Sequence, residues 1–231
     1  MILSVHVPKT AGSSFRLFLQ EALGPRLMWD YGDWPEMRDA QAQAHNERRR
    51  VEMLAQVDDI RQKFSVIHGH YLPEKYLTVF PDAPVSAFLR DPFQHALSTY
   101  LHAQRRLLEL DESKLPPGLR LFRDERMTLT DMLAASPDHQ AGYLSAVPLE
   151  VMAMIGITED FDRGVALFQK LFGLRARSSS WRDNVNPDRN GHVYEVSADV
   201  RRAVEKYRAG DIELYRLGCE RFLAQARRHG V

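Results

Sequence analysis

The sequence predicts a three-layer α/β fold in which a central, mostly parallel sheet is flanked by helices. Two observations lead to this class. Four short apolar runs are distributed along the chain, and stretches with helical spacing of apolar residues separate them. Strands that alternate with helices pair in parallel, because each helix carries the chain back across the sheet. Ligands of such sheets bind beyond the carboxyl ends of the strands, so functional residues are expected there.

Each predicted strand is a short apolar run that ends at turn-forming or polar residues. The first run ends before Pro8, the second at His68-Gly69-His70 and the third at Arg90-Asp91-Pro92. Continuous apolar runs of this length are typical of strands that are buried on both faces. The predicted strands are Ile2–Val7, Phe64–Ile67, Pro84–Leu89 and Val151–Ile157.

The predicted helices follow from periodic apolar positions and from end signals. Gly24-Pro25 ends the first, Pro92 suits the first turn of the third, and Gly173 ends the fifth. The segments Glu112–Asp124, which contains Pro116-Pro117-Gly118, and Arg175–His192 are expected to be loops. The predicted helices are Ser13–Leu23, Gln41–Phe64, Pro92 to about Leu110, Leu129–Ala135, Glu159–Phe172, Asp199–Arg208 and Ile212–Arg228.

Composition narrows the function classes. The 231 residues carry 31 Lys+Arg and 31 Asp+Glu, and 44% are hydrophobic. This apolar fraction excludes a disordered chain, and the length favours a single domain over residues 1–231. The neutral balance gives no indication of nucleic-acid binding. The single cysteine, Cys219, excludes an intrachain disulfide and a multi-cysteine metal site, and no metal is expected.

No targeting or membrane-spanning segment is expected. The start, Met1–Val7, lacks a basic region and is too short for a signal peptide. The longest apolar stretch, Ala141–Ile157, is interrupted by Pro148 and Glu150. A cytoplasmic protein is therefore expected.

The segment after the first strand has the features of an anion-binding loop. Pro8-Lys9-Thr10-Ala11-Gly12-Ser13-Ser14-Phe15 joins a strand to a helix. Backbone N–H groups of a small-residue loop and of a helix start can bind a phosphate-like group, and Lys9 adds a charge. The segment is not a Walker A loop, because that motif places its Lys and a Ser/Thr after the glycines. An ordinary strand-to-helix turn with a capping serine is the alternative.

The end of the third strand offers a second anion site. Arg90 lies at the strand tip, and Ser98 lies on the helix that Pro92 opens. A guanidinium and a hydroxyl there can bind another phosphate. A local ion pair between Arg90 and Asp91 is the alternative reading of this motif alone. Two anion sites at neighbouring strand ends indicate a nucleotide that is phosphorylated at two positions.

Taken together, these strings resemble motifs of sulfotransferases that use 3′-phosphoadenosine-5′-phosphosulfate (PAPS). His6–Phe15 resembles the 5′-phosphosulfate loop, and Phe88–Tyr100 resembles the 3′-phosphate motif. Ile155–Phe161 and Asp211–Tyr215 resemble segments of the membrane-anchored carbohydrate sulfotransferases. Ile67–His70 resembles the histidine motif of the heparan and uronyl 2-O-sulfotransferases.

The resemblance implies a P-loop-NTPase-like fold, PAPS as donor and PAP as product. The acceptor would be a hydroxyl, most simply of a carbohydrate. The implied donor-binding residues are Pro8, Lys9, Thr10, Ala11, Gly12, Ser13, Ser14, Phe15, Arg90 and Ser98. One departure is His95, since the family commonly has an Arg there, which can serve the structure of the motif rather than the ligand.

The catalytic residues implied are Lys9, which would neutralise the departing phosphate, and a histidine base. His70 follows the second strand and is the first candidate, with His68 as competitor or supporting partner. His6 is read as a structural residue. A plain turn at His68–His70 is the alternative.

Two other functions stay open. One is a P-loop-like kinase that uses ATP and Mg²⁺, and the other is a non-catalytic nucleotide-binding protein on the same scaffold. In the late loop, Ser180 and Arg182 can reach a 3′-phosphate and Trp181 can stack on adenine or a sugar, or the loop is simply solvated.

Overall fold

The computed structural model describes residues 1–231 except 36, 38, 116, 177–180 and 182–192. Its sheet has strand order β2-β3-β1-β4-β5, and every pairing is parallel. Placing β1 in the middle, with later strands on both sides, produces a reversal of strand order next to β1, where ligands bind in such folds. The strands are β1 (Ile2–Val5), β2 (Leu27–Asp30), β3 (Val66–Gly69), β4 (Val85–Leu89) and β5 (Met154–Ile157).

Helices connect and cover these strands. The helices of the described residues are α1 (Gly12–Leu23), α2 (Ala40–Leu54), α3 (Val57–Lys63), α4 (Glu74–Leu77), α5 (Pro92–Glu109), α6 (Pro117–Asp124), α7 (Leu129–Ala135), α8 (His139–Leu144), α9 (Phe161–Phe172), α10 (Ala198–Tyr207) and α11 (Ala209–His229). Short 3₁₀ turns lie at η1 (Gly24–Arg26), η2 (Glu112–Lys114), η3 (Leu149–Val151) and η4 (Thr158–Asp160).

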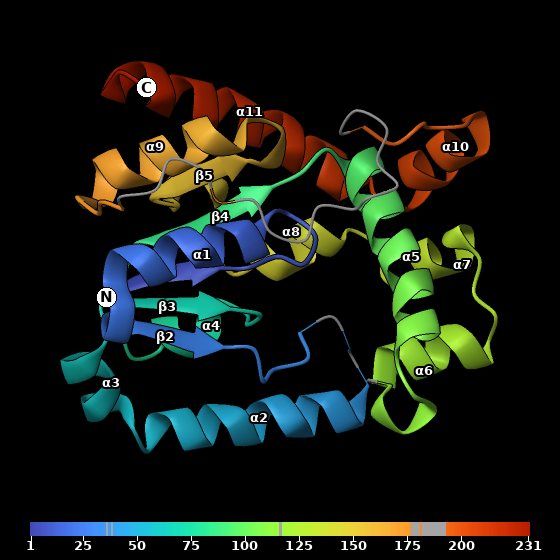
Figure 1. Ribbon diagram of the computed structural model, residues 1–231, viewed down its shortest axis with the longest axis horizontal. Helices are drawn as coiled ribbons and strands as arrows, with labels where there is room; N and C mark the ends of the chain where they lie inside the picture. Colours follow the sequence, from blue (N-terminus) through green and yellow to red (C-terminus); the bar gives the residue numbers. More distant parts are fainter. Residues whose placement is uncertain (36, 38, 116, 177–180, 182–192) are drawn as a thin grey trace.

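The helices form layers on the two faces of the sheet (Figure 1). A Cβ on Gly164 of α9 would collide with the ring of Phe88, and one on Gly218 of α11 would collide with Leu89. Phe88 and Leu89 are consecutive on β4 and so point to opposite faces. The Phe15 ring of α1 also packs on Phe88, with centroids 4.9 Å apart. Therefore α1 and α9 share one face, and α11 covers the other.

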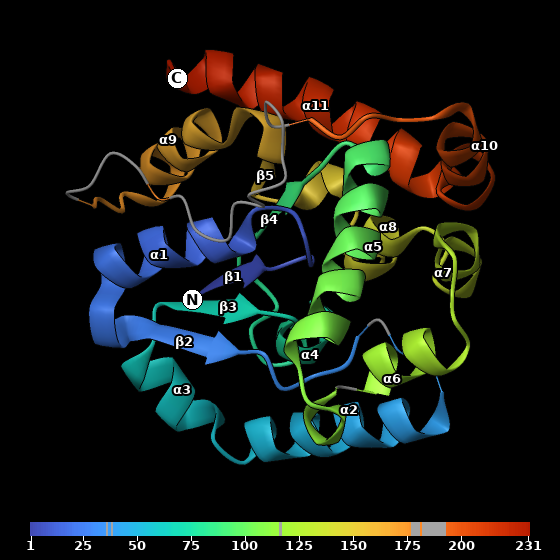
Figure 2. The same cartoon turned by 45° about the vertical axis from the view of Figure 1, so that its right-hand side comes forward.

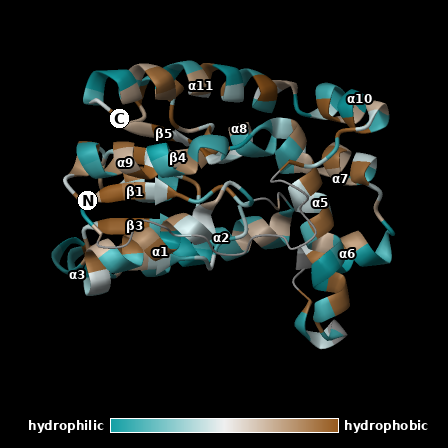
Figure 3. Ribbon diagram, turned by 45° about the horizontal axis from the view of Figure 1, so that its top comes forward, coloured by the Kyte–Doolittle hydropathy of each residue, from teal (hydrophilic) through white to brown (hydrophobic). Residues whose placement is uncertain are grey.

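Helix α5 stands across the carboxyl ends of the strands. The arrows of β2 and β3 point toward it in Figures 1 and 2. The strands are coloured as hydrophobic in Figure 3, while α11 alternates between hydrophobic and hydrophilic positions, as expected of a helix with one face on a core. This arrangement leaves the ends of β1, β3 and β4 facing α5, and these are the ends that carry the polar motifs.

The predicted fold class is confirmed, and four segments differ from prediction. The expected strand Ile2–Val7 ends at Val5, and Val151–Ile157 begins with a 3₁₀ turn, so that β5 starts at Met154. The single helix expected over Gln41–Phe64 is two helices, α2 and α3, interrupted at Ala55 and Gln56. Part of the expected loop Glu112–Asp124 is α6, because Pro117 occupies the first helical position, where its missing N–H costs nothing.

Strand β2 and helices α4 and α8 have no counterpart in the prediction. β2 is only four residues long, lies at the sheet edge and includes the exposed Trp29, so it shows no continuous apolar run. Its pairing with β3 rather than its own sequence defines it.

Candidate functional site

The loop between β1 and α1 has the backbone of an anion cradle. Lys9 and Ala11 have φ of 67° and 66°, in the left-handed region that side chains rarely adopt. The Thr10 hydroxyl donates to the Val7 carbonyl at 2.7 Å and closes the turn. Left-handed residues that alternate with right-handed ones turn successive N–H groups to one side, where they can bind an anion. Helix α1 begins at the next residue, Gly12, so its positive end adds to this site.

The remaining predicted residues of this segment have distinct places. Ser13 and Ser14 lie partly exposed in the first turn of α1, where no acidic residue occurs. Phe15 differs, since its ring is 2% exposed within the core and its N–H donates to the Ala11 carbonyl at 3.0 Å. Neither the ring nor the backbone N–H of Phe15 is therefore available to an anion in the cradle.

Two residues that follow β4, Arg90 and His95, bond to backbone carbonyl groups of the cradle loop. Arg90 Nη1 donates to the Lys9 carbonyl at 3.0 Å, and His95 Nε2 lies 2.9 Å from the Pro8 carbonyl. Because a carbonyl can only accept, Nε2 of His95 carries the proton. Burial lowers the pKa of His95 well below its usual value, so the ring is neutral. Carbonyl oxygens held in this way do not point into the cradle, where they would repel an anion.

The β4 end is itself fixed from two distant segments. The Gln140 side chain bonds both the N–H and the carbonyl of Arg90, each at 2.9 Å. The Gln94 side chain bonds the N–H and carbonyl of Tyr194, at 2.7 and 2.9 Å, and the Tyr194 ring lies 5.8 Å from the Arg90 guanidinium. Ser98 is one turn beyond Gln94 on the same face of α5 and is 6% exposed. Arg90 and Ser98 are thus both buried at the carboxyl end of β4.

Sequence reasoning missed Gln94, Gln140 and Tyr194. No local signal identifies them, because Gln94 and Tyr194 are separated by 100 positions in the chain. Only the tertiary structure brings them together.

The histidines at the ends of β1 and β3 form one cluster. In the register of these strands Val5 is opposite Gly69, so the following residues, His6 and His70, are neighbours. Their ring centroids are 4.5 Å apart, and His6 stacks on His68 at 5.3 Å. Of the two, only His70 follows a predicted strand, whereas His6 lies within the predicted strand Ile2–Val7, so the register of the observed strands was needed to show that these rings meet.

His68 and His70 differ in exposure. His68 is 1% exposed, and its Nδ1 lies 2.8 Å from the Ser4 hydroxyl. His70 is half-buried. Burial lowers the pKa of His70 to about 4, and burial together with the neighbouring His70 lowers that of His68 to about 3. Both rings are neutral near pH 7, and the Nε2 atom of each is buried without a hydrogen-bond partner among the described residues.

Gly12 of the cradle and Tyr31, which follows β2, both contact His6 of the histidine cluster. A Cβ on Gly12 would lie 1.9 Å from Cδ2 of His6, so only glycine allows this ring to pack against the cradle. The Tyr31 hydroxyl lies 2.9 Å from His6 Nδ1. The structure therefore places His6, which was expected to be merely structural, between the cradle and His70.

The late loop is only partly described. Trp181 is 8% exposed, packs on Phe18 with centroids 5.2 Å apart, and donates from Nε1 to the Glu21 carboxylate at 3.1 Å. The prediction that Trp181 stacks on adenine or a sugar is not compatible with this packing on α1. Ser180 and Arg182 lie outside the described residues.

Two features are absent from the described part of the chain. No three or more His, Cys, Asp or Glu side chains are grouped so that they could hold a metal ion. No helix there has the length and apolar character needed to cross a membrane.

Comparison with known proteins gives one informative likeness. No protein-family profile matches the sequence, and no curated protein matches it significantly. Among solved structures, the chain is similar to a sulfotransferase from Alicyclobacillus acidocaldarius, with a TM-score of 0.54 over 92% of each chain and 17% sequence identity. At this identity the likeness concerns the fold, and the chain has the α/β fold of that sulfotransferase.

Proposed function

We propose that this protein is a PAPS-dependent sulfotransferase that transfers a sulfuryl group to an acceptor hydroxyl. The observation that carries the proposal is the juxtaposition of two features at the ends of β1 and β3. An anion cradle, built by left-handed Lys9 and Ala11 and the start of α1, lies directly against the cluster of His6, His68 and His70. A donor anion and a proton acceptor would thus be side by side.

The residues of the cradle fit a donor with phosphates at two positions. Lys9, the loop N–H groups and the hydroxyls of Ser13 and Ser14 would hold the 5′-phosphosulfate. Arg90 and Ser98, at the β4 end next to the cradle, would hold the 3′-phosphate. The fit rests on the left-handed backbone, on the glycine that lets the loop approach His6, and on the near-burial of Arg90.

Sulfuryl transfer requires two contributions from this chain: stabilisation of the departing phosphate and removal of the acceptor's proton. The bound donor supplies an activated sulfuryl group for in-line transfer. Lys9 and the backbone N–H groups would offset the negative charge that builds on the departing phosphate oxygen. His70 would accept the proton of the acceptor hydroxyl, which typically contributes ~10²–10⁴-fold to rate.

His70 suits the base role better than His68 does. The His70 side chain is half-buried, whereas His68 is 1% exposed and bonded to Ser4. With a pKa lowered to about 4 by burial, His70 is in its proton-accepting form at neutral pH, although its basicity is reduced. His68 would be a supporting partner, since its ring stacks with that of His6.

A carbohydrate acceptor is the finer part of the proposal. It rests on the resemblance of Ile67–His70 to the histidine motif of the 2-O-sulfotransferases. Sulfation of a panel of sugars and simple phenols, followed with radiolabelled PAPS, tests it. Preference for phenols would contradict this part while leaving sulfuryl transfer intact.

A thermal-shift comparison of PAP, PAPS, ATP and ADP tests the donor. A ligand at a hundred times its Kd stabilises by ~2.7 kcal/mol, so PAP should raise Tm clearly. Lys9→Ala and Arg90→Ala should reduce the PAP shift, whereas Lys63→Ala, an exposed lysine on α3, should not. His70→Ala should bind PAP normally and lose transfer.

Three outcomes would redirect the proposal. A shift with ATP, but none with PAP, and dependence on Mg²⁺ would support the kinase alternative. PAP binding without transfer to any acceptor would support a non-catalytic nucleotide-binding protein. Unchanged turnover in His70→Ala would remove His70 as the base.

A further inference from the structure

Tyr31 lies against the candidate base, although it belongs to a strand end that sequence reasoning did not identify. It directly follows β2, and its ring centroid is 4.8 Å from that of His70, at an interplanar angle of 66°. We propose that Tyr31 is a positioning residue for His70 and that a buried ion network holds it in place. The inference rests on the proposed function, since it assigns a role within the same site.

Strand pairing brings Tyr31 to this position. In the register of β2 with β3, Asp30 is opposite Gly69, so Tyr31 follows beside His70. The approach is unusually close, because a Cβ on Gly69 would lie 1.7 Å from the Asp30 carbonyl oxygen. Only glycine permits this contact, so the residue between His68 and His70 also determines how near Tyr31 comes.

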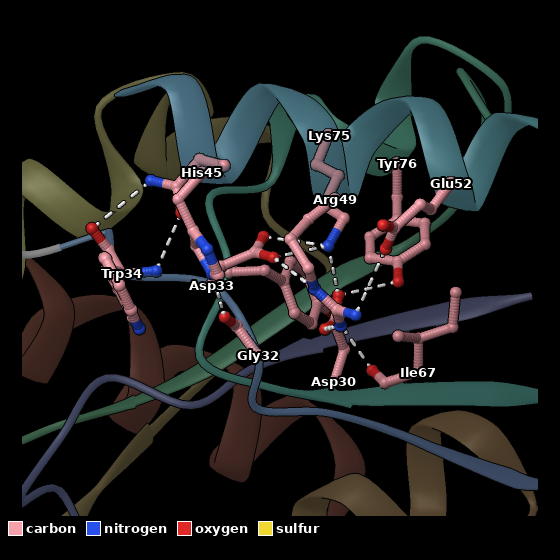
Figure 4. A network of polar contacts seen from close by, with 12 residues as sticks. Asp30, Gly32, Asp33, Trp34, His45, Arg49, Glu52, Ile67, Lys75 and Tyr76 are labelled. Carbon is pink, nitrogen blue, oxygen red and sulfur yellow. Dashed lines mark hydrogen bonds and ion pairs between the residues drawn. The ribbon is translucent and has the colours of Figure 1, made fainter. Parts of the chain in front are cut away.

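An ion network bonds to Asp30 and Asp33, as Figure 4 shows, and these residues come before and after Tyr31 in the sequence. Asp30 precedes Tyr31 and Asp33 follows two positions later, and both are under 10% exposed. Lys75 Nζ from α4 donates to Asp30 Oδ2 at 2.6 Å and to both oxygens of Asp33 at 2.8 Å. One buried ammonium therefore holds both ends of the four-residue segment from Asp30 to Asp33.

Two further side chains complete the network. Arg49 of α2 donates to Asp30 Oδ1 at 3.1 Å and lies 3.5 Å from Asp33 Oδ1. The Tyr76 hydroxyl donates to Asp30 Oδ2 at 2.8 Å. Buried charges are costly unless they are paired and hydrogen-bonded, and here two cations face two carboxylates. The hydrogen bonds from Lys75, Arg49 and Tyr76 hold both carboxylates in place, as a positioning element requires.

Tyr31 acts on the cluster through its hydroxyl and its ring. The hydroxyl is 2.9 Å from His6 Nδ1 and fixes the orientation of the imidazole that packs on His70. The Tyr31 ring contacts His70 directly while remaining 38% exposed, so it lies at the surface rather than in the core. A general base must be held within hydrogen-bond reach of the proton it takes, and small displacements reduce rate strongly.

The electrostatic surroundings of the cluster are known from each side. The rings of His6 and Tyr31, which follow β1 and β2, contact the His70 ring, and His68 interacts electrostatically with it. Lys9 of the cradle and Arg16 of α1 act electrostatically on His6. Removing the Tyr31 hydroxyl changes none of the formal charges near neutral pH. An effect of Tyr31→Phe on the histidines would therefore report the lost hydrogen bond.

The test compares Tyr31→Phe with Tyr71→Phe in the full chain. Tyr71 is a matched control, since its buried hydroxyl also makes one hydrogen bond, to the Ile67 carbonyl at 2.9 Å. Three quantities are measured: the titration of each imidazole by NMR, the Kd of PAP, and the pH profile of single-turnover sulfuryl transfer.

Tyr31→Phe should shift the imidazole titration of His6, leave the Kd of PAP within about twofold, and slow transfer by about tenfold or more, a part of the ~10²–10⁴ of a positioned base. The pH profile should move with the histidine titration. Tyr71→Phe should leave all three unchanged.

Unmoved imidazole signals in Tyr31→Phe, or equal effects in Tyr71→Phe, would overturn the inference even if the wild type binds PAP and transfers sulfate. Failure of the wild type to bind PAP would instead overturn the proposed function, and with it the role of Tyr31. The two failures are thus read from different measurements.

Discussion

At the scale of single residues, His95 illustrates how a departure from a family pattern can be accommodated. The resembling motif commonly has an Arg at this position, and here a neutral, fully buried imidazole donates to the Pro8 carbonyl. This contact is structural, because it reaches the loop backbone and not the open side of the cradle. It supports the reading that this position serves the structure of the motif.

Replacing His95 with Leu should loosen the cradle. One hydrogen bond contributes about 0.5–1.5 kcal/mol, so the affinity for PAP should fall by roughly threefold to tenfold. Amide hydrogen exchange of residues 9–14 should become faster, which is a readout independent of function. Both are measured on the purified variant, by calorimetry and by mass spectrometry.

His45→Leu is the matched control for this prediction. His45 Nε2 also bonds a backbone carbonyl, that of Gly32 at 2.7 Å, but in the loop after β2. If His45→Leu accelerates exchange at residues 9–14 as much as His95→Leu does, the brace assigned to His95 does not exist.

At the scale of elements, the end of β2 depends on charges from two helices. Burial penalises the carboxylate of Asp30, yet Lys75 with Tyr76 and Arg49 holds its pKa below the usual value. Burial raises the pKa of Asp33 despite the hydrogen bond from Lys75. The two carboxylates thus compete for one ammonium, and the turn is stable only while Lys75 lies between them.

Lys75→Met should destabilise the protein by about 3–5 kcal/mol, because it leaves two buried carboxylates without their central cation. Urea unfolding at pH 7 measures this loss. Adding Asp33→Asn should recover part of it, since one of the unpaired charges is then removed.

Lys63→Met is the control on a surface ion pair. Lys63 pairs with Asp59 at 2.6 Å, but both side chains are more than 60% exposed, so the expected change is about 0–1 kcal/mol. A loss for Lys75→Met as small as that for Lys63→Met would contradict the view that the network clamps the β2 end.

At the scale of the whole molecule, buried neutral histidines make stability depend on pH. Burial lowers the pKa to about 3 for His68 and to about 4 for His70 and His102, from an ordinary value of 6.5. Below pH 6.5 the unfolded chain binds protons that the folded chain does not. Stability is therefore fully present above this pH and is lost as the pH falls toward 4.

Between pH 6 and pH 5 the free energy of unfolding should fall by about 1 kcal/mol or more. Each histidine can contribute at most about 1.4 kcal/mol per pH unit. Asp211 acts in the opposite direction, because burial raises its pKa to about 6 and the folded state then takes up a proton. Burial also raises the pKa of Asp33 and of Glu159. The histidines whose pKa burial lowers are nevertheless more numerous, namely His6, His68, His70, His95 and His102.

Urea unfolding at half-unit steps from pH 7.5 to 5 measures this slope. His70→Gln is the informative variant, since it removes one titrating ring at the cleft and should flatten the curve. A slope that is flat in the wild type would contradict the assignment of these rings as buried and neutral.

The alternation of strands and helices, and hence the parallel sheet, could be predicted from local patterns in the sequence. The sequence also indicates that polar motifs follow the first and third strands, because apolar runs that stop at Pro8 and Arg90 are local signals. Residues of the cradle, from Lys9 to Ser14, could be identified for the same reason. The left-handed conformations of Lys9 and Ala11 could not, since neither residue type favours them.

Only the tertiary structure decided which distant residues share the site. The order of the strands places β1 between β3 and β4, and the registers set His6 beside His70 and Tyr31 beside both. The β2 end, the Lys75 network and the Gln94–Tyr194 contact depend on pairings between residues 19 to 100 positions apart. Such contacts leave no periodic trace in the sequence, because they are determined by packing and hydrogen bonding after the chain has folded.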